Sequence, residues 1–227
     1  MIFNNKPALN SDGSVPASYY DDAYWEKGAE SGKGSYNGNS YDENIEACKI
    51  WAQDCYNRWG PFESFLELGC GRAWNIYGFI HLPELGIQKM MGVDFSHYAV
   101  ETSNEKVKPF LIENGISDLS FLEDRSFDLI FSNDVLEHLT RAQVVSCLTH
   151  CYRITKKKMA HLISIGDGKD IPDGEVPSDQ DQSHITLKSA AWWLEMFNLM
   201  FRPDGWIVNF VDRGRTIEIV VERRNAE

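Results

Sequence analysis

Short apolar runs alternate with segments of helical periodicity through most of this chain. The runs are typical of strands and cover residues 64–68, 90–94, 108–113, 127–132, 159–165, 206–211 and 216–222. The apolar spacing between them predicts helices over 41–59, 74–81, 97–107, 141–152 and 187–201. Strands that alternate with helices form parallel βαβ units with right-handed crossovers. The pattern therefore predicts an α/β fold with helices on both faces of a mostly parallel sheet.

The last two apolar runs are expected to break the parallel pattern. Only residues 212–215 separate them, which is too short for a crossover helix, so the two strands must pair antiparallel. The predicted product is a seven-stranded sheet with a C-terminal antiparallel hairpin. Ligands of such sheets bind beyond the carboxyl ends of the parallel strands.

Length and composition indicate one globular domain and exclude several classes of protein. The chain has 227 residues and a net charge of -12, which disfavours binding to a nucleic-acid backbone. The lysines at 156–158 are interpreted as a solvated turn. No apolar stretch is long enough to span a membrane, and no secretory signal is visible. The five cysteines are interpreted as reduced thiols, so we expect a cytoplasmic protein without a metal site.

Residues 1–40 differ in composition from the predicted domain at 41–227. They are rich in Gly, Ser, Asn and aromatic residues. We expect this segment to form a lid whose rings, including Tyr24 and Tyr36, attract a cationic ligand. The alternative is a strap that packs on the edge of the sheet.

A glycine turn follows the first predicted strand, at Gly69-Cys70-Gly71. Glycines at this position let the backbone turn sharply and approach a ligand closely. Glu67 precedes the turn, and Asp94 ends the second strand, where an acid commonly binds ribose hydroxyls. A dinucleotide fingerprint needs glycine where Trp74 stands, and no phosphate-binding loop is present. The pattern therefore favours a nucleoside ligand without phosphates, and the acidic residues suit a sulfonium cation.

Three motifs resemble those of the class I S-adenosylmethionine-dependent methyltransferases. They are ELGCGR (67–72), GVDFS (92–96) and SFDLIFSNDVLEHL (126–139). The resemblance extends from about residue 64 to 222, and YWEKGAESGKGSY (24–36) resembles a leader of some bacterial members. It implies a Rossmann-like fold with S-adenosylmethionine as the cofactor.

The resemblance also implies roles for particular residues. Glycine-turn residues would pass beneath the methionine portion, Asp94 would hold the ribose, and Phe95 would flank the adenine. The full expected cofactor set is Tyr24, Tyr36, Glu67, Gly69, Cys70, Gly71, Asp94, Phe95, Ser96, Asp118, Leu119, Asn133 and Asp134. The chain departs from the family at Ala73, where glycine is usual, and at 114–117, where an acid is often found.

Two histidines are candidates for catalysis. His138 follows Asp134 by one helical turn, and His184 lies in a polar loop before a predicted helix. The imidazole of His138 would suit a general base at neutral pH, and His184 could position the substrate. Either residue could instead have a structural role.

The favoured function is methyl transfer to a small-molecule acceptor. One alternative is attack on the aminocarboxypropyl arm of the same cofactor, which releases methylthioadenosine. A second alternative is a binding module without catalysis. A nucleic-acid or protein acceptor is disfavoured, because 133–136 reads Asn-Asp-Val-Leu and differs from the Asn-Pro-Pro-Tyr type of motif.

Overall fold

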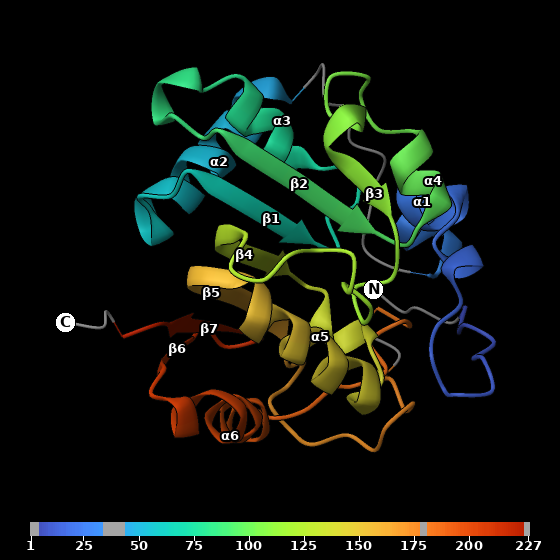
Figure 1. The fold of residues 1–227 in the computed structure, drawn as a ribbon. Helices are drawn as coiled ribbons and strands as arrows, with labels where there is room; N and C mark the ends of the chain where they lie inside the picture. The colour runs from blue at the N-terminus through green and yellow to red at the C-terminus, as the bar shows by residue number, and fades with distance from the viewer. Residues whose placement is uncertain (1–4, 34–43, 178–180, 225–227) are drawn as a thin grey trace.

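The computed structural model describes residues 5–33, 44–177 and 181–224. Its centre is a seven-stranded sheet in the order β3-β2-β1-β4-β5-β7-β6 (Figure 1). The strands are β1 (Ser64–Leu68), β2 (Lys89–Asp94), β3 (Leu111–Glu113), β4 (Phe127–Asn133), β5 (Thr155–Ser164), β6 (Ile207–Asp212) and β7 (Thr216–Glu222). Strands β1 to β5 are parallel, and β7 pairs antiparallel with both β5 and β6. The predicted mixed sheet and its C-terminal hairpin are confirmed.

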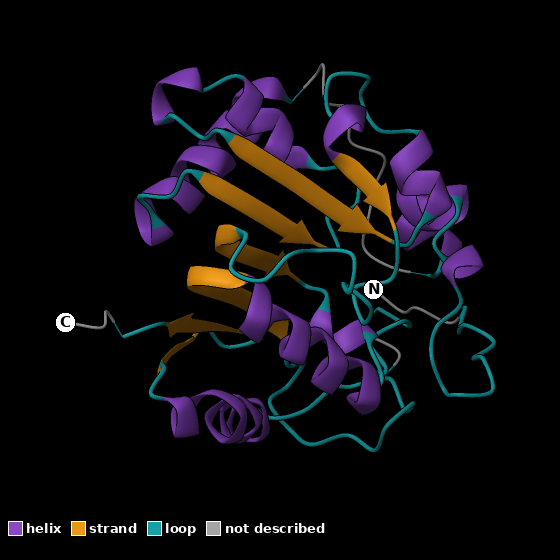
Figure 2. Cartoon of the chain, viewed as in Figure 1, coloured by secondary structure: helices purple, strands orange, loops and turns teal. Residues whose placement is uncertain are grey.

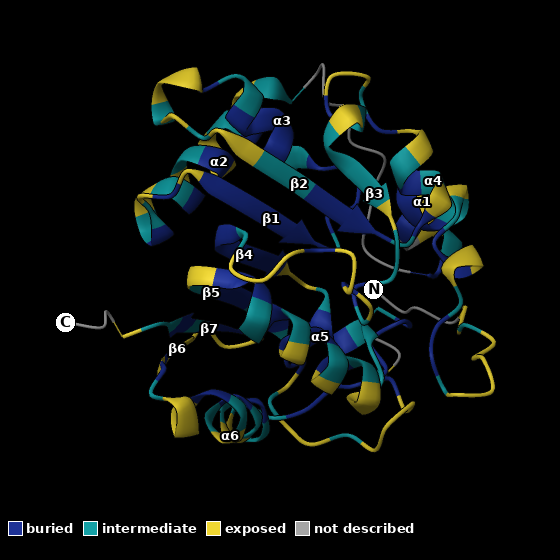
Figure 3. Cartoon of the chain, in the orientation of Figure 1, coloured by how far each residue is buried: buried dark blue, intermediate teal, exposed yellow. Residues whose placement is uncertain are grey.

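Helices cover both faces of this sheet, as predicted (Figure 2). The α-helices are α1 (Asp22–Ser31), α2 (Ile45–Trp59), α3 (Trp74–Ile80), α4 (His97–Glu101), α5 (Arg141–Ile154) and α6 (Ala190–Phe201). Short 3-10 helices cover Ala17–Tyr19, Pro83–Leu85, Lys108–Phe110, Leu136–His138 and Arg202–Asp204. Side chains alternate across a strand, so Phe65 packs with α2 and α3, whereas Leu66 and Leu68 pack with α5 and α6. The central strands β1 and β4 are accordingly buried between two helical layers (Figure 3).

Several predicted element boundaries are wrong, and local hydrogen bonds explain two of them. The helix expected over 97–107 ends at Glu101, because the Asn104 side chain accepts a bond from the backbone N–H of Lys106 and forms a turn. The helix expected from 187 begins at Ala190, because the Ser189 side chain caps its first turn. The third strand covers only Leu111–Glu113, since a 3-10 helix containing a proline precedes it.

The three lysines at 156–158 belong to β5, so their interpretation as a turn is wrong. Lys158 forms an ion pair with Glu222 of the neighbouring β7, at 2.9 Å. Strand β5 begins directly after α5, because Thr155 is both the C-cap of the helix and the first residue of the strand. The lysines therefore extend the sheet and expose their charged ends at its surface.

The N-terminal segment contains a helix that the composition did not predict. Asp21 caps α1 by accepting a hydrogen bond from the backbone N–H of Tyr24, and Gly32 ends the helix in a left-handed conformation. Tyr20, Tyr24 and Trp25 are buried. Figure 1 places α1 beyond the carboxyl ends of β2 and β3, beside α4.

Within the described part of the chain, no helix combines the length and the apolar character needed to cross a membrane.

Candidate functional site

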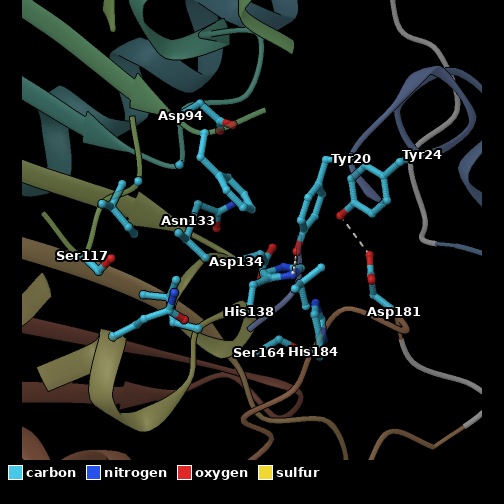
Figure 4. A pocket seen from close by; sticks show the side chains of 18 of the residues that line it. Tyr20, Tyr24, Asp94, Ser117, Asn133, Asp134, His138, Ser164, Asp181 and His184 are labelled. Carbon is cyan, nitrogen blue, oxygen red and sulfur yellow. Dashed lines mark hydrogen bonds between the residues drawn. The ribbon is translucent and has the colours of Figure 1, made fainter. Parts of the chain in front are cut away.

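A cavity of about 410 Å³ opens beyond the carboxyl ends of the central strands. Its volume falls in the range of about 300–1,000 Å³ that suits one small-molecule ligand. The walls combine residues from the N-terminal segment, the strand ends and the loop before α6 (Figure 4). The lining residues are Val15, Tyr20, Tyr24, Trp25, Gly69, Asp94, Phe95, Gly115, Ile116, Ser117, Asn133, Asp134, Val135, His138, Leu139, Gln143, Ser164, Asp181, His184, Arg215 and Thr216.

The glycine turn after β1 is fastened to Asp94 at the end of β2. One Asp94 carboxylate oxygen accepts the backbone N–H of Gly71 at 2.7 Å, and the other accepts the N–H of Ser96 at 2.8 Å. Burial raises the pKa of Asp94, although these backbone bonds oppose the shift. Each oxygen keeps a second lone pair, so Asp94 can accept further bonds from a ligand.

Both glycines of the turn have backbone conformations that require glycine. Gly69 has φ 61°, and a Cβ added there would lie 2.5 Å from Val135 Cγ2. Gly71 has φ 52°, and a Cβ there would lie 2.8 Å from the Trp25 ring. The turn is therefore held between the β4 loop and the N-terminal helix α1.

Several residues of the expected cofactor set lie on or behind this wall. Gly69, Asp94, Phe95, Asn133 and Asp134 line the cavity. Tyr24 also lines it, whereas Tyr36 lies outside the described residues. The remaining members, Glu67, Cys70, Gly71, Ser96, Asp118 and Leu119, do not line the cavity.

Glu67 and Ser96 support the cavity wall from behind. Glu67 accepts a hydrogen bond from Asn75 at 2.6 Å, and burial raises the pKa of its carboxyl to about 8. Ser96 accepts a bond from the Trp25 indole N–H at 3.1 Å and donates to the Tyr20 carbonyl at 2.7 Å. Ser96 therefore joins the N-terminal segment to the end of β2.

The loop before β4 meets the cavity slightly earlier in the chain than expected. Gly115, Ile116 and Ser117 form this part of the wall. Asp118 is exposed and binds the backbone N–H of Ser120, whereas Leu119 is fully buried in the hydrophobic core.

The N-terminal segment forms one side of the cavity through Tyr20, Tyr24 and Trp25. The Tyr20 ring packs edge-on against Phe95, with centroids 5.1 Å apart. The Tyr24 hydroxyl donates to Asp181 at 3.0 Å (Figure 4). The rings are thus packed against one another and against the domain, and they line one side of the cavity.

His138 is held by a hydrogen-bonded chain at the opposite end from Asp94 (Figure 4). Its Nδ1 lies 2.9 Å from Ser183 Oγ and 3.1 Å from the Tyr20 hydroxyl. Ser183 donates its single hydroxyl proton to Asp181, so it can accept a hydrogen bond from His138 when Nδ1 is the protonated ring nitrogen. That tautomer carries its lone pair on Nε2, and burial lowers the pKa of the ring so that the neutral form is favoured.

His184 lies beside His138, with the ring centroids 4.5 Å apart. Burial, reinforced by His138, lowers the pKa of His184 to about 3. The same region contains Glu137, which is fully buried and accepts the backbone N–H of Ser164 at 2.9 Å. Burial raises the pKa of Glu137, and the nearby Asp134 carboxylate raises it further. The structure thus brings both predicted catalytic histidines together with two carboxyl groups.

Sequence reasoning did not single out the residues that orient His138. Asp181, Ser183 and Tyr20 come from segments far apart in the sequence, and Ser183 and Asp181 lie in a loop without regular periodicity. Glu137 stands inside the recognised motif at 126–139, but its burial beside His184 depends on tertiary packing. The capping pattern of Asp21 and Gly32 was the available signal for α1.

Comparisons with known proteins agree with this geometry. Residues 66–162 match a family model described as a methyltransferase domain. The search of curated proteins finds no match. A structure from Pyrococcus horikoshii OT3 is 17% identical with a TM-score of 0.56, over 92% of this chain and 99% of that chain.

Two further structures share the fold. An S-adenosylmethionine-dependent methyltransferase from Aquifex aeolicus is 15% identical with a TM-score of 0.51, over 78% of this chain and 97% of that chain. The plantazolicin methyltransferase BpumL, solved with a monoazolic desmethyl analog and S-adenosylhomocysteine, is 13% identical with a TM-score of 0.58, over 81% of this chain and 85% of that chain. Residues 66–162 of this chain therefore match a methyltransferase-domain model, and the chain shares the fold of S-adenosylmethionine-dependent methyltransferases.

Proposed function

We propose that this enzyme transfers the methyl group of S-adenosylmethionine to a small-molecule acceptor bound in the cavity. The observation that carries the proposal is one cavity with two chemically different ends. Asp94 lies at one end, which we assign to the nucleoside, and His138 and His184 lie at the other. A shared cavity brings two reactants together in one orientation, which is the main requirement of a displacement reaction.

The residues at the nucleoside end fit the cofactor. S-adenosylmethionine supplies a methyl group that its sulfonium has already activated. Asp94 offers the unused lone pairs of a buried carboxylate to the ribose hydroxyls, and Gly69 lets the backbone approach the methionine portion. Phe95 provides a ring for the adenine. Asn133 and Asp134 offer side-chain oxygens at the β4 end to the amino group of the methionine portion.

The proposed acceptor lies between the N-terminal rings and the pair of histidines. The rings of Tyr20 and Tyr24 line this region beside His138. A cavity of about 410 Å³ lined by several carboxylates supports a small acceptor in preference to a polymer. The net charge of -12 further disfavours a nucleic-acid acceptor.

We also propose that the enzyme acts in the cytoplasm. All five cysteines are free and buried in the structure. Free thiols persist where the surroundings are reducing. Fractionation of the cells that express the protein tests this proposal, and recovery of the protein with a secreted fraction contradicts it.

Product analysis tests the proposed reaction. The protein is incubated with S-adenosylmethionine alone and then with small-metabolite pools, RNA or unrelated proteins, and products are identified by mass spectrometry. We expect S-adenosylhomocysteine to form only when the metabolite pool is present. Methylthioadenosine released from S-adenosylmethionine alone would show that the aminocarboxypropyl arm reacts, and methylation of RNA or protein would contradict the small-molecule acceptor.

A further inference from the structure

Three metal-ligating side chains converge at the histidine end of the cavity. One ligand atom from each of Glu137, His138 and His184 lies within 4.8 Å of the other two. His184 Nε2 is 4.0 Å from Glu137 Oε1. Ligands held at about 2.0–2.2 Å from a common ion lie at most about 4 Å apart, so small side-chain rotations complete the site.

Two buried atoms of this cluster have no hydrogen-bond partner among the residues that the structure describes. They are Glu137 Oε2 and His184 Nδ1. Glu137 is fully buried and His184 is 8% exposed. Buried polar atoms are nearly always paired, and a buried carboxylate without a partner is costly. Asp134 interacts with Glu137 and lines the cavity, so two acidic side chains lie together at this point. A cation beside Glu137 satisfies this arrangement, whereas a second anion does not.

The orientation of His138 points to the same conclusion. Its Nδ1–H is directed to Ser183, which in turn donates to Asp181. Histidines that bind metals usually donate their second N–H to a carboxylate or an oxygen in this way, which fixes the ring and its tautomer. The Nε2 lone pair is then available to an ion.

We propose that Glu137, His138 and His184 bind one divalent first-row transition-metal ion that holds the methyl acceptor through an oxygen atom. Two imidazoles with one carboxylate suit Mn²⁺, Fe²⁺, Co²⁺ or Zn²⁺, whereas Mg²⁺ and Ca²⁺ prefer oxygen ligands. This ligand set leaves coordination positions open on the cavity side for an acceptor oxygen. The inference departs from the sequence-based expectation of no metal, and its catalytic part rests on the proposed function.

The ion gives the acceptor a defined chemical class, a hydroxyl compound with a second oxygen placed to chelate. Binding to the ion would lower the pKa of the hydroxyl, whose proton is released to water. The oxygen lone pair forms a bond to the methyl carbon. The carbon–sulfur bond breaks, its electron pair stays on sulfur, and the sulfonium becomes the neutral thioether of S-adenosylhomocysteine.

Metal binding is tested directly on the full chain, without reference to activity. The protein is stripped with a chelator and titrated with MnCl₂ or ZnCl₂ by calorimetry, and bound metal is counted by mass spectrometry. We expect one equivalent. Pulsed electron paramagnetic resonance of the Mn²⁺-loaded wild type should detect coupling to imidazole nitrogen, so this measurement does not depend on any variant that fails to fold.

Matched variants locate the site. His184→Gln and Glu137→Gln should each lower the affinity for the metal ion. The loss should exceed the roughly 10–100-fold that is typical when a residue hydrogen-bonded to a metal ligand is replaced. His97→Gln is the control, because His97 is exposed and forms a surface pair with Glu113 at 2.8 Å. It should bind metal as the wild type does.

Particular outcomes overturn the inference. The inference is wrong if the protein binds no stoichiometric metal or if the spectra show no nitrogen coupling. It is also wrong if the affinity for metal is unchanged in both His184→Gln and Glu137→Gln. Methyl transfer at an equal rate in the stripped enzyme removes the catalytic part and leaves the proposed function standing. The protein could instead bind one equivalent of metal at these residues and methylate no acceptor. That result would support the metal site and contradict the proposed function.

Discussion

The Tyr20 hydroxyl lies 3.1 Å from His138 Nδ1, so the N-terminal segment directly contacts the candidate catalytic residue. The two residues are 118 positions apart in the chain. Through this contact the N-terminal segment places a hydroxyl group beside the imidazole of His138, in addition to lining the cavity. It also provides a way to test whether the segment acts as a lid.

The lid proposal predicts that ligand binding slows hydrogen exchange in α1. Tyr20, Tyr24 and Trp25 line the cavity, so a bound ligand would be packed against them and oppose local opening. Hydrogen exchange measured by mass spectrometry with and without S-adenosylhomocysteine should show slower exchange over residues 19–31. The β6 strand, which is distant from the cavity wall, serves as the internal control. Equal protection in both states would identify the segment as a permanent strap.

Asp94→Asn should weaken cofactor binding at least tenfold. Hydrogen bonds to a charged group contribute about 1.5–3 kcal/mol each, and the amide loses that charge. Calorimetry with S-adenosylhomocysteine provides the measurement, and circular dichroism checks the fold. Asp118→Asn is the matched control, because Asp118 is exposed and does not line the cavity. An equal loss in Asp118→Asn would return Asp118 to the cofactor-binding set that the resemblance implies.

Gly71→Ala should destabilise the protein more than Gly86→Ala does. Both glycines have positive φ, 52° and 69°, so alanine strains the backbone at both positions by about 1–2 kcal/mol. Only at Gly71 would the new methyl also approach the Trp25 ring, at 2.8 Å, whereas nothing lies within 4 Å at Gly86. Urea unfolding measures the difference. Equal free energies of unfolding would show that Trp25 moves away without cost.

Glu67→Gln should change how stability depends on pH. Burial raises the pKa of Glu67 from 4.5 to about 8, so folding favours the protonated acid. Its favourable contribution is complete below pH 4.5 and is lost as pH rises toward 8. Glutamine stays neutral, so the variant should gain more than about 1 kcal/mol relative to the wild type between pH 5 and 8. Parallel unfolding curves across this range would indicate an ordinary pKa.

Ser183→Ala should lower turnover by about 10–100-fold and leave affinity for S-adenosylhomocysteine unchanged. The substitution removes the acceptor that fixes the tautomer of His138, and orienting residues of this kind have effects of that size. Ser103→Ala is the control, since its buried hydroxyl bonds only within the α4 region, to Ala99 at 2.8 Å. If both variants retain full kcat, the chain from Asp181 to His138 has no positioning role.

The sequence predicted the sheet, and it predicted that Gly69 and Asp94 lie together at one edge of that sheet, because local signals define both. Ser64–Leu68 is an apolar run with defined ends, and Gly69 and Asp94 follow strands whose order the alternation predicts. The carboxyl ends of neighbouring parallel strands meet at one edge, so these residues come together from topology alone.

The histidine end could not be predicted in the same way. Asp181 and Ser183 reach His138 through a loop whose path depends on tertiary packing, and Tyr20 approaches from the other end of the chain. The burial of α1 was also not predicted, because the residues around its aromatic side chains are polar. Trp25 packs against Gly71, and its N–H binds Ser96, and no periodic pattern in the sequence indicates either contact. Hydrogen bonds between side chains that are far apart in the chain produce no recognisable pattern in the sequence.

The hydrogen bond between Tyr24 and Asp181 spans 157 residues, and this has a consequence for folding. Contacts between distant segments form late, because closing a long loop costs entropy before any contact offsets it. During synthesis the N-terminal rings leave the ribosome long before Asp181 and Ile185, against which they pack, have been made. The N-terminal rings can pack against Phe95 and Ala99 before then, but the bond from Tyr24 to Asp181 cannot form until the C-terminal half has been synthesised.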